Sequence, residues 1–484
     1  MASEIDRHLM IVPGGTGDLM RRKILPAMRR LTEEGALKDR VVILAAGRRT
    51  KFDDESYREW ASEALKEADL PPEAEGSGWC GRCLHYQSVG DQEKEDFEAL
   101  KERIEELEEE HDLPGNRVFY MATPPGAFID TVERLGEVGL NEAPGWTRIV
   151  IEKPFGHDLD SAVELNKRIH RYFDEEQVYR IDHYLGKETV QNLLTFRFAN
   201  TLFDSVWNRD RIGSVEITVA EDLGVGDRGE FYDSVGALRD MVQNHMTQLL
   251  TITAMEHPAE FQADTIRDEK VKVLRSLAPI DPSQIVYGQY TAGELEGEQV
   301  PGYLEEEGVA EDSSTETFVA VRCYVQNWRW QGVPFVLRTG KRMPKKQTQI
   351  VINFRCPALA LFQRHSEATV HANSLVITLQ PDEGFDLKFE VKAPRDPLRL
   401  KTQNLSFRYD EAFKELPDAY ETLLVDIAEG DQTLFVRGDE VEESWRQYTP
   451  LLQEHQRVYP YEVGTTGPEE ARRLLEPRGE ACPI

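Results

Sequence analysis

The chain has 484 residues and a formal net charge of −31 at pH 7. This length exceeds what one hydrophobic core usually supports, so we expect two domains. The excess of negative charge argues against a nucleic-acid partner. No apolar run reaches the roughly 18 residues that a membrane span needs, and the first residues lack the basic and long apolar stretches of a signal peptide. We therefore expect a cytoplasmic protein with no membrane partner.

Acidic residues gather at 102–110 and 305–307. Two interpretations stay open: a surface that keeps molecules apart in solution, or one adapted to high salt, where screening makes the repulsion tolerable. The five cysteines are an odd, sparse set, which argues against a disulfide framework. Cys80 and Cys83 form a CxxC pair, but too few further ligands lie nearby for zinc. We expect reduced thiols there and no metal.

Strand-like and helix-like segments alternate through the first half. Apolar runs predict strands at 8–13, 41–46, 117–122 and 148–152, and amphipathic patterns predict helices at 19–31, 54–67 and 92–110. Pro-Pro-Gly at 124–126 predicts a turn. Alternation of this kind is typical of a parallel, doubly wound sheet, so we expect an α/β N-terminal domain over residues 1–180.

The second half has a different pattern. A helical stretch at 187–204 is followed by a strand at 212–220 and a long helix at 233–255. Strand-like runs then follow at 315–328, 333–338, 348–355, 374–380 and 385–392, before a helix at 409–428. Successive strands without crossovers predict an α+β domain over residues 181–484, with a large, mainly antiparallel sheet.

A glycine-rich turn joins the first strand to the first helix. Its residues are Gly14, Gly15, Thr16, Gly17, Asp18 and Leu19. Glycines let a backbone approach a pyrophosphate, and the following helix offers free N–H groups and its positive end. The spacing is only Gly-x-x-Gly, which also occurs in structural turns. Its position favours a nucleotide site and a Rossmann-like domain.

Arg48 and Arg49 come directly after the second predicted strand. Enzymes that bind NAD usually carry a carboxylate here, which grips the ribose hydroxyls, whereas arginine suits the 2′-phosphate of NADP. The pair therefore predicts NADP, with NAD as a possible second coenzyme. The alternative is a solvated surface pair.

Polar residues interrupt the apolar helix predicted at 233–255. They are Asp240, Gln243, Asn244, His245 and Gln248. Because buried polar groups need partners or a function, such a cluster predicts the lining of a cleft. Further upstream, His183 and Lys187 are four residues apart at a predicted helix start, so they would share a face. With Tyr184 they offer donors and positive charge to a dianion; a surface helix start is the alternative.

Residues 180–188, RIDHYLGKE, closely resemble the signature of glucose-6-phosphate dehydrogenases. Further segments agree with that family, in its order: GGTGDL at 14–19, EKPFG at 152–156, RDMVQNH at 239–245 and RTGK at 338–341. The resemblance covers nearly the whole chain. One departure is Met20, where the family usually has a small residue.

The resemblance implies an activity and a set of residue roles. The chain would oxidise glucose 6-phosphate to the lactone with NADP, the first oxidative step of the pentose phosphate pathway. His245 would be the general base and Asp182 its carboxylate partner. His183, Tyr184 and Lys187 would bind the 6-phosphate. The remaining implied substrate contacts are Glu221, Asp240, Lys341, Lys346 and Lys153.

The resemblance also implies coenzyme contacts and an assembly. The coenzyme would lie on the loop 14–19 and Lys153, the last placed between coenzyme and sugar, and on Arg48, which the position after the second strand already indicates. The second domain would bind substrate and form a homodimer or a dimer of dimers. Rival functions stay open: a dehydrogenase of another hexose phosphate or of glucose, and a catalytically silent regulatory binder. The joint presence of Asp182, His183, Lys187 and His245 speaks against the silent binder.

Overall fold

The computed structural model describes residues 5–48, 52–70, 78–90, 93–295, 297–358, 370–394, 399–413, 416–453 and 457–475. The chain forms two compact units. Unit 1 holds Met1–Lys187, Glu260–Arg267 and Pro417–Glu442, and unit 2 holds the remainder. The domain boundary at residue 180 stays a prediction, and unit 1 takes two later segments that the sequence did not assign to it. No helix among the described residues is long and apolar enough to cross a membrane.

Unit 1 is built on a seven-stranded sheet in the order β17-β6-β5-β4-β1-β2-β3. Its strands are β1 (His8–Pro13), β2 (Val41–Gly47), β3 (Leu84–Ser88), β4 (Arg117–Met121), β5 (Thr147–Ile151), β6 (Val178–Ile181) and β17 (Phe435–Val436). Strands β1 to β6 pair in parallel, and β17 is antiparallel to β6. The predicted parallel α/β sheet is confirmed. The strand order reverses at β1, the point where ligands bind in such sheets.

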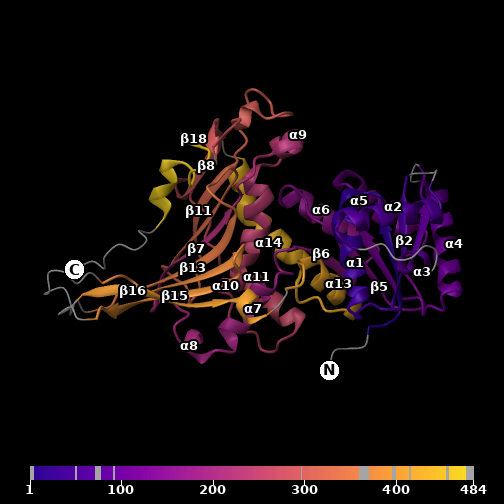
Figure 1. The fold of residues 1–484 in the computed structure, drawn as a ribbon, viewed down its shortest axis with the longest axis horizontal. Helices are drawn as coiled ribbons and strands as arrows, with labels where there is room; N and C mark the ends of the chain where they lie inside the picture. Colours follow the sequence, from indigo (N-terminus) through magenta and orange to yellow (C-terminus); the bar gives the residue numbers. More distant parts are fainter. Residues whose placement is uncertain are drawn as a thin grey trace. The chain divides into compact units, whose positions relative to one another are not determined.

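The helices of unit 1 surround this sheet (Figure 1). They are η1 (Met20–Ile24), α1 (Leu25–Glu33), α2 (Asp54–Glu67), α3 (Trp79–Cys83), α4 (Lys94–Glu110), α5 (Pro125–Glu137), α6 (Leu159–Ile169), η2 (Glu175–Gln177) and α13 (Ala419–Glu429). Apolar residues of the strands, such as Leu9 and Phe119, form one core with Leu100 and Ile104 of α4. The turn predicted at 124–126 is wrong, because Pro125 opens α5 at the first helical position, where proline's fixed φ and missing N–H cost nothing.

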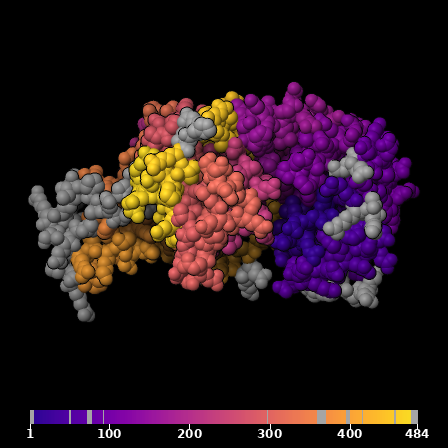
Figure 2. All heavy atoms as spheres, turned by 90° about the horizontal axis from the view of Figure 1, so that it is seen from above, coloured from indigo at the N-terminus to yellow at the C-terminus, as the bar shows by residue number. Residues whose placement is uncertain are grey.

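Unit 2 is built on a nine-stranded sheet in the order β16-β15-β14-β13-β7-β12-β11-β8-β18. Its strands are β7 (Ile212–Ala220), β8 (Ile285–Thr291), β11 (Phe318–Tyr324), β12 (Pro334–Gly340), β13 (Gln347–Phe354), β14 (Ser374–Gln380), β15 (Gly384–Lys392), β16 (Leu400–Arg408) and β18 (Val458–Glu462). Only β7–β12 and β8–β18 pair in parallel among these described strands. The mainly antiparallel sheet is confirmed. Figure 2 shows the yellow region, which contains β18, against the salmon-coloured region that contains β8.

Further helices and one hairpin complete the described chain. The hairpin joins β9 (Gly293–Leu295) to β10 (Glu298–Val300). The helices are α7 (Glu188–Phe198), α8 (Thr201–Asp204), η3 (Gly226–Arg228), α9 (Gly229–Asp233), η4 (Leu238–Met246), α10 (Thr247–Ala254), α11 (Ala263–Arg275), η5 (Pro282–Gln284), η6 (Tyr303–Glu305), α12 (Tyr409–Ala412), α14 (Gly438–Leu452) and η7 (Glu469–Leu474). Helices α11 and α14 begin in unit 1 and end in unit 2.

Besides the helix predicted at 187–204, which is α7 and α8 with Ala199 and Asn200 between them, two further predicted helices are divided in the structure. The helix predicted at 233–255 is three segments, because Gly236 takes a φ of 72° after α9 and the next segment, η4, is a π-helix. The helix predicted at 409–428 is α12 and α13. Pro417 precedes the Asp418 N-cap of α13, whose side chain accepts the N–H of Tyr420. In both cases an apolar pattern continued across a residue that ends a helix.

The cysteines agree in part with expectation. Cys80 and Cys83 are reduced thiols, as predicted, and so is the buried Cys323. Cys356 is disulfide-bonded, which the sparse cysteine content did not predict. Cys482 lies outside the described residues.

Candidate active site

A cavity of about 870 Å³ opens at the carboxyl edge of the unit 1 sheet. Residues that follow β1, β2, β3, β4 and β5 line it, so it lies where the strand order reverses. The predicted coenzyme residues that line it are Gly14, Thr16, Gly17, Asp18, Leu19, Arg48 and Lys153. Gly15 is not among the lining residues, and Arg49 lies outside the described residues. The location is that of a dinucleotide site in a Rossmann-like sheet.

Two glycines permit the tight turn after β1. Gly14 takes a φ of 83°, and a Cβ there would lie 2.4 Å from Ala122 O of the neighbouring strand end. A Cβ on Gly15 would lie 2.6 Å from the Cβ of Ala45. Both glycine N–H groups donate to Ala46 O, at 2.8 and 3.1 Å. The loop is therefore clamped between the ends of β2 and β4, and any side chain at Gly14 or Gly15 would displace it.

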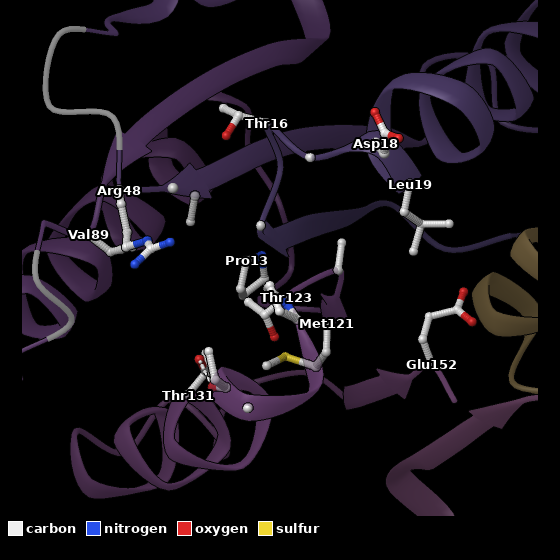
Figure 3. Close-up of a pocket in the computed structure, with 18 of the residues that line it drawn as sticks. Pro13, Thr16, Asp18, Leu19, Arg48, Val89, Met121, Thr123, Thr131 and Glu152 are labelled. Carbon is white, nitrogen blue, oxygen red and sulfur yellow. Dashed lines mark hydrogen bonds between the residues drawn. The ribbon is translucent and has the colours of Figure 1, made fainter. Parts of the chain in front are cut away.

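The two ends of the cavity differ in charge. Figure 3 shows the Arg48 guanidinium beside Val89 at one end, and Glu152 at the other. Arg48 is exposed at the end of β2, where the chain passes close over Tyr86: a Cβ on Gly47 would lie 3.0 Å from the Tyr86 hydroxyl. The β2 end therefore offers a cation within an otherwise acidic protein.

Glu152 follows β5 and is held by two phenols. Tyr120 donates to Glu152 Oε1 at 2.7 Å, and Tyr420 of α13 donates to the same oxygen at 3.2 Å. Burial raises the pKa of the Glu152 carboxyl above its ordinary value, while the two phenol bonds and the nearby Lys153 oppose that rise. Sequence reasoning assigned no role to Tyr420, because no local pattern links two residues so far apart in the chain.

The signature residues form a turn at the carboxyl end of β6. Asp182 is 3% exposed, and its Oδ1 accepts the N–H of Tyr184 at 3.0 Å. Lys187 Nζ lies 4.4 Å from the centroid of the Tyr184 ring, and the His183 ring lies 5.0 Å from it. The expected helix start is wrong, since α7 begins only at Glu188. The turn, closed by the Asp182 side chain, still gathers the three predicted phosphate ligands.

Close packing requires the glycine of this turn. A Cβ on Gly186 would lie 2.7 Å from Ala419 O and 2.9 Å from Leu423 of α13. The segment from α13 thus supports the turn directly, within unit 1.

Strand register brings the sugar-binding candidates of unit 2 together. In the parallel pair β7–β12, Ala220 lies opposite Gly340, so the next residues, Glu221 and Lys341, leave the sheet at the same edge. Lys341 Nζ lies 2.6 Å from Glu221 Oε2, and Lys341 is only 4% exposed. Lys346 is exposed and directly precedes β13, whose first residue pairs with Ala220. All three therefore occupy one edge.

Tyr232 joins this group, and the sequence did not indicate it. Lys341 Nζ lies 4.9 Å from the centroid of the buried Tyr232 ring. Burial raises the pKa of the Tyr232 hydroxyl well above its ordinary value, and the carboxylates of Asp240, Glu316 and Glu221 raise it further. Asp240 belongs to η4, which packs against β7 and β12 and also carries the buried His245.

Comparison with known proteins identifies the family. Residues 11–192 match the family description "Glucose-6-phosphate dehydrogenase, NAD binding domain", and residues 194–482 match "Glucose-6-phosphate dehydrogenase, C-terminal domain". The chain belongs to the glucose-6-phosphate dehydrogenase family. The resemblance expected from the sequence is confirmed. Family membership also makes the chain an oxidoreductase with a nicotinamide-dinucleotide domain.

Relatives of this dehydrogenase family match along nearly their full length. A protein named "Glucose-6-phosphate 1-dehydrogenase" from Aggregatibacter actinomycetemcomitans is 43% identical, covering 97% of this chain and 96% of that protein. One from Rhizobium meliloti is 45% identical over the same shares.

Solved structures agree. One described as glucose-6-phosphate dehydrogenase in complex with its substrate glucose-6-phosphate has a TM-score of 0.89 and 38% identity, covering 98% of each chain. The glucose-6-phosphate 1-dehydrogenase of Mycobacterium avium has a TM-score of 0.81 and 35% identity, covering 99% of this chain and 98% of that one.

Proposed function

We propose that this chain oxidises glucose 6-phosphate at C1 to the 6-phospho lactone, with NADP as the preferred hydride acceptor and NAD as a second one. The observation that carries the proposal is the turn after β6, which brings His183, Tyr184 and Lys187 together beside Asp182. The chain that carries this turn belongs to a family of dehydrogenases. The solved relative with glucose 6-phosphate bound supports the same substrate.

The turn supplies the anchor for the phosphate. An ammonium, an imidazole and a phenol in one short segment offer several donors to a dianion, and charge-assisted bonds to phosphate are strong. The stack of Lys187 on the Tyr184 ring limits the freedom of the long side chain before substrate binds. Binding through the remote phosphate then holds C1 in place for reaction.

His245 is the proposed general base, and Asp182 its carboxylate partner. Imidazole can take the proton from the C1 hydroxyl as hydride leaves C1, because its pKa lies near working pH. A carboxylate would fix the tautomer and stabilise the imidazolium that forms. The Asp182 carboxylate is already oriented by the Tyr184 N–H.

The edge of the unit 2 sheet supplies the proposed sugar contacts. Glu221 can accept from a sugar hydroxyl while Lys341 holds it in place at 2.6 Å. Asp240 on η4 and the exposed Lys346 complete the set. A carboxylate that is already paired needs little reordering when the sugar arrives.

The residues around the unit 1 cavity fit a dinucleotide. The clamped loop 14–19 would hold the pyrophosphate, and Arg48 would bind the 2′-phosphate. Lys153 would lie between the nicotinamide and the sugar. The coenzyme, when bound, supplies the hydride-accepting ring. The chain's own residues hold the coenzyme and the sugar in place and supply the base.

We also propose a cytoplasmic place in the pentose phosphate pathway and a homodimer or dimer of dimers. The test is to follow the ultraviolet absorbance of reduced coenzyme with glucose 6-phosphate, other hexose phosphates and glucose, each with NADP and NAD. The proposal expects the highest kcat/KM with glucose 6-phosphate and NADP. Faster oxidation of another sugar would favour the rival dehydrogenase, and no reduction with any pair would favour a silent binder.

A further inference from the structure

The π-helix η4 sets the position of the proposed base. The N–H of Thr247 donates to Val242 O, five residues back, and also contacts Asn244 O. In an α-helix that N–H would go to Gln243 O, four residues back. One extra residue in a turn rotates everything before it by roughly 100° relative to the helix after it. His245 lies inside this turn and is 1% exposed, so its direction depends on whether the π-turn is kept.

The carbonyl that the π-turn bypasses has a donor from elsewhere. Ser444 Oγ of α14 donates to Gln243 O at 2.6 Å, and Ser444 is 2% exposed. A buried carbonyl without a donor is costly, so the serine hydroxyl favours the π-turn over a regular helix, where the carbonyl would already be paired.

A second pair of hydroxyls holds the other side of the turn. Thr247 Oγ1 lies 2.6 Å from Val242 O and 2.9 Å from the Tyr448 hydroxyl. Val242 O can only accept, so Thr247 gives it its single proton and accepts from Tyr448. Burial raises the pKa of Tyr448 well above its ordinary value, which keeps that proton on the phenol. Ser444 and Tyr448 are four residues apart on α14, so they share one face.

We propose that Ser444, Tyr448 and Thr247 are positioning residues that keep the π-turn and thereby aim the His245 imidazole at the sugar. The inference rests on the proposed role of His245. All three hydroxyls act on backbone carbonyls of η4 or on each other, and they belong with His245 to unit 2. A π-turn at a reactive side chain is a recurrent feature of functional sites.

The test compares Ser444→Ala with a matched control, Thr253→Val. The Thr253 hydroxyl is equally buried in α10 but donates to Leu249 O at 2.7 Å, an ordinary contact four residues back. We expect Ser444→Ala to lower kcat on the order of ten- to a hundredfold, since small displacements of a reacting group are costly. KM for glucose 6-phosphate should hardly change. Tyr448→Phe should cause a smaller fall, and Ser444→Thr should restore most of kcat.

Two further readouts separate positioning from general damage. The pH at which kcat falls on the acid side should shift in Ser444→Ala, because the base would sit in a changed environment, and it should not shift in Thr253→Val. In the background of His245→Asn, Ser444→Ala should cause no further loss, because the residue acts through His245. Should Ser444→Ala fail to fold, Tyr448→Phe carries the same comparison.

The results that would overturn this inference differ from those that would overturn the proposed role of His245. Near-normal turnover in His245→Asn would overturn the role of the base itself. If that variant is inactive but Ser444→Ala matches Thr253→Val in kcat and pH profile, the positioning inference is overturned alone. An equal loss from Ser444→Ala with and without His245 would also overturn it, because the serine would then act elsewhere.

Discussion

The coenzyme cavity of unit 1 and the polar edge of unit 2 are assembled differently. The cavity depends on one continuous loop, whose backbone is clamped between Ala46 and Ala122 because Gly14 and Gly15 have no side chains. The polar edge depends on strand register, which pairs Glu221 with Lys341, and on hydroxyls of α14 that reach η4. The first arrangement is encoded locally, whereas the second exists only after distant segments fold together.

The largest expected effect tests the arrangement in unit 2, at the proposed base His245. His245→Asn should lower kcat by about 10² to 10⁴, the usual contribution of a general base. The KM for glucose 6-phosphate should change little, because a base matters chiefly in the transition state. Steady-state kinetics over a range of substrate concentrations measure both, and circular dichroism serves as the folding control. Turnover within a few fold of the parent would contradict the assignment.

The local arrangement is tested by adding a single methyl group to the loop. Gly14→Ala combines a positive φ with a Cβ at 2.4 Å from Ala122 O, so we expect a loss on the order of 2 to 4 kcal/mol of stability and a much weaker grip on coenzyme. Gly126→Ala is the matched control, since that glycine also lines the cavity but no heavy atom lies within 4 Å of its added Cβ. Thermal unfolding measures the loss of stability, and coenzyme titration measures the weaker binding. Equal stability of the two variants would mean that the loop is not clamped.

Lowering the pH should reduce the stability of unit 1 through a buried histidine in its sheet. His8 begins β1, and burial lowers its pKa from 6.5 to about 4. Between these values the unfolded chain binds a proton that the folded chain does not, so the stability contribution is complete above about pH 6.5 and is lost as the pH falls toward 4. The change should reach a few kcal/mol.

Hydrogen exchange as a function of pH measures this loss strand by strand. Amides of β1 should lose protection earlier than those of β7 as the pH falls. His8→Gln should flatten this dependence, and the same change at the exposed His157 should not. A pH dependence unaltered by His8→Gln would assign acid sensitivity to other groups.

A smaller effect concerns the phosphate turn. Lys187→Ala should cost about 1.5 to 3 kcal/mol of binding to glucose 6-phosphate, the range for a hydrogen bond to a charged group. The loss should disappear with unphosphorylated glucose, which lacks the dianion. Comparing kcat/KM for the two sugars gives the measurement. A loss of the same size for both would assign Lys187 to the fold of the turn, through its contact with Tyr184.

The same contrast explains which features the sequence could predict. Strands β1 and β2 are buried on both faces of a parallel sheet, so each is a continuous apolar run that the sequence alone reveals. The loop after β1 followed from its glycines. The two-residue β17 and the edge strand β3 carry no such run, and they depend on neighbours for their pairing.

Errors at the candidate site have the same origin. Every residue of α10 is buried, so that part of the helix has no polar face that could reveal the rotation caused by one inserted residue. The π-turn of η4 was therefore invisible, and the helix 233–255 looked continuous. His183 and Lys187 have helical spacing, but the Asp182 side chain and the close approach of α13 at Gly186 make a turn instead. Tyr232 and Tyr420 enter their clusters by tertiary packing, which single-sequence patterns do not record.

The smallest expected effect, on coenzyme choice, returns to unit 1. Arg48 is exposed at the β2 end of the cavity, so solvent screens its charge and limits what it can contribute. A guanidinium can nevertheless make paired bonds to a 2′-phosphate, and it cannot accept the hydrogen bonds that a free ribose diol donates. Arg48→Ala should therefore raise KM for NADP about tenfold and change that for NAD much less. Arg48→Lys should lie between, since it keeps the charge and loses the paired geometry. A similar rise for both coenzymes would show that the guanidinium stacks on the adenine ring common to both, and would locate the choice of coenzyme elsewhere along the cavity.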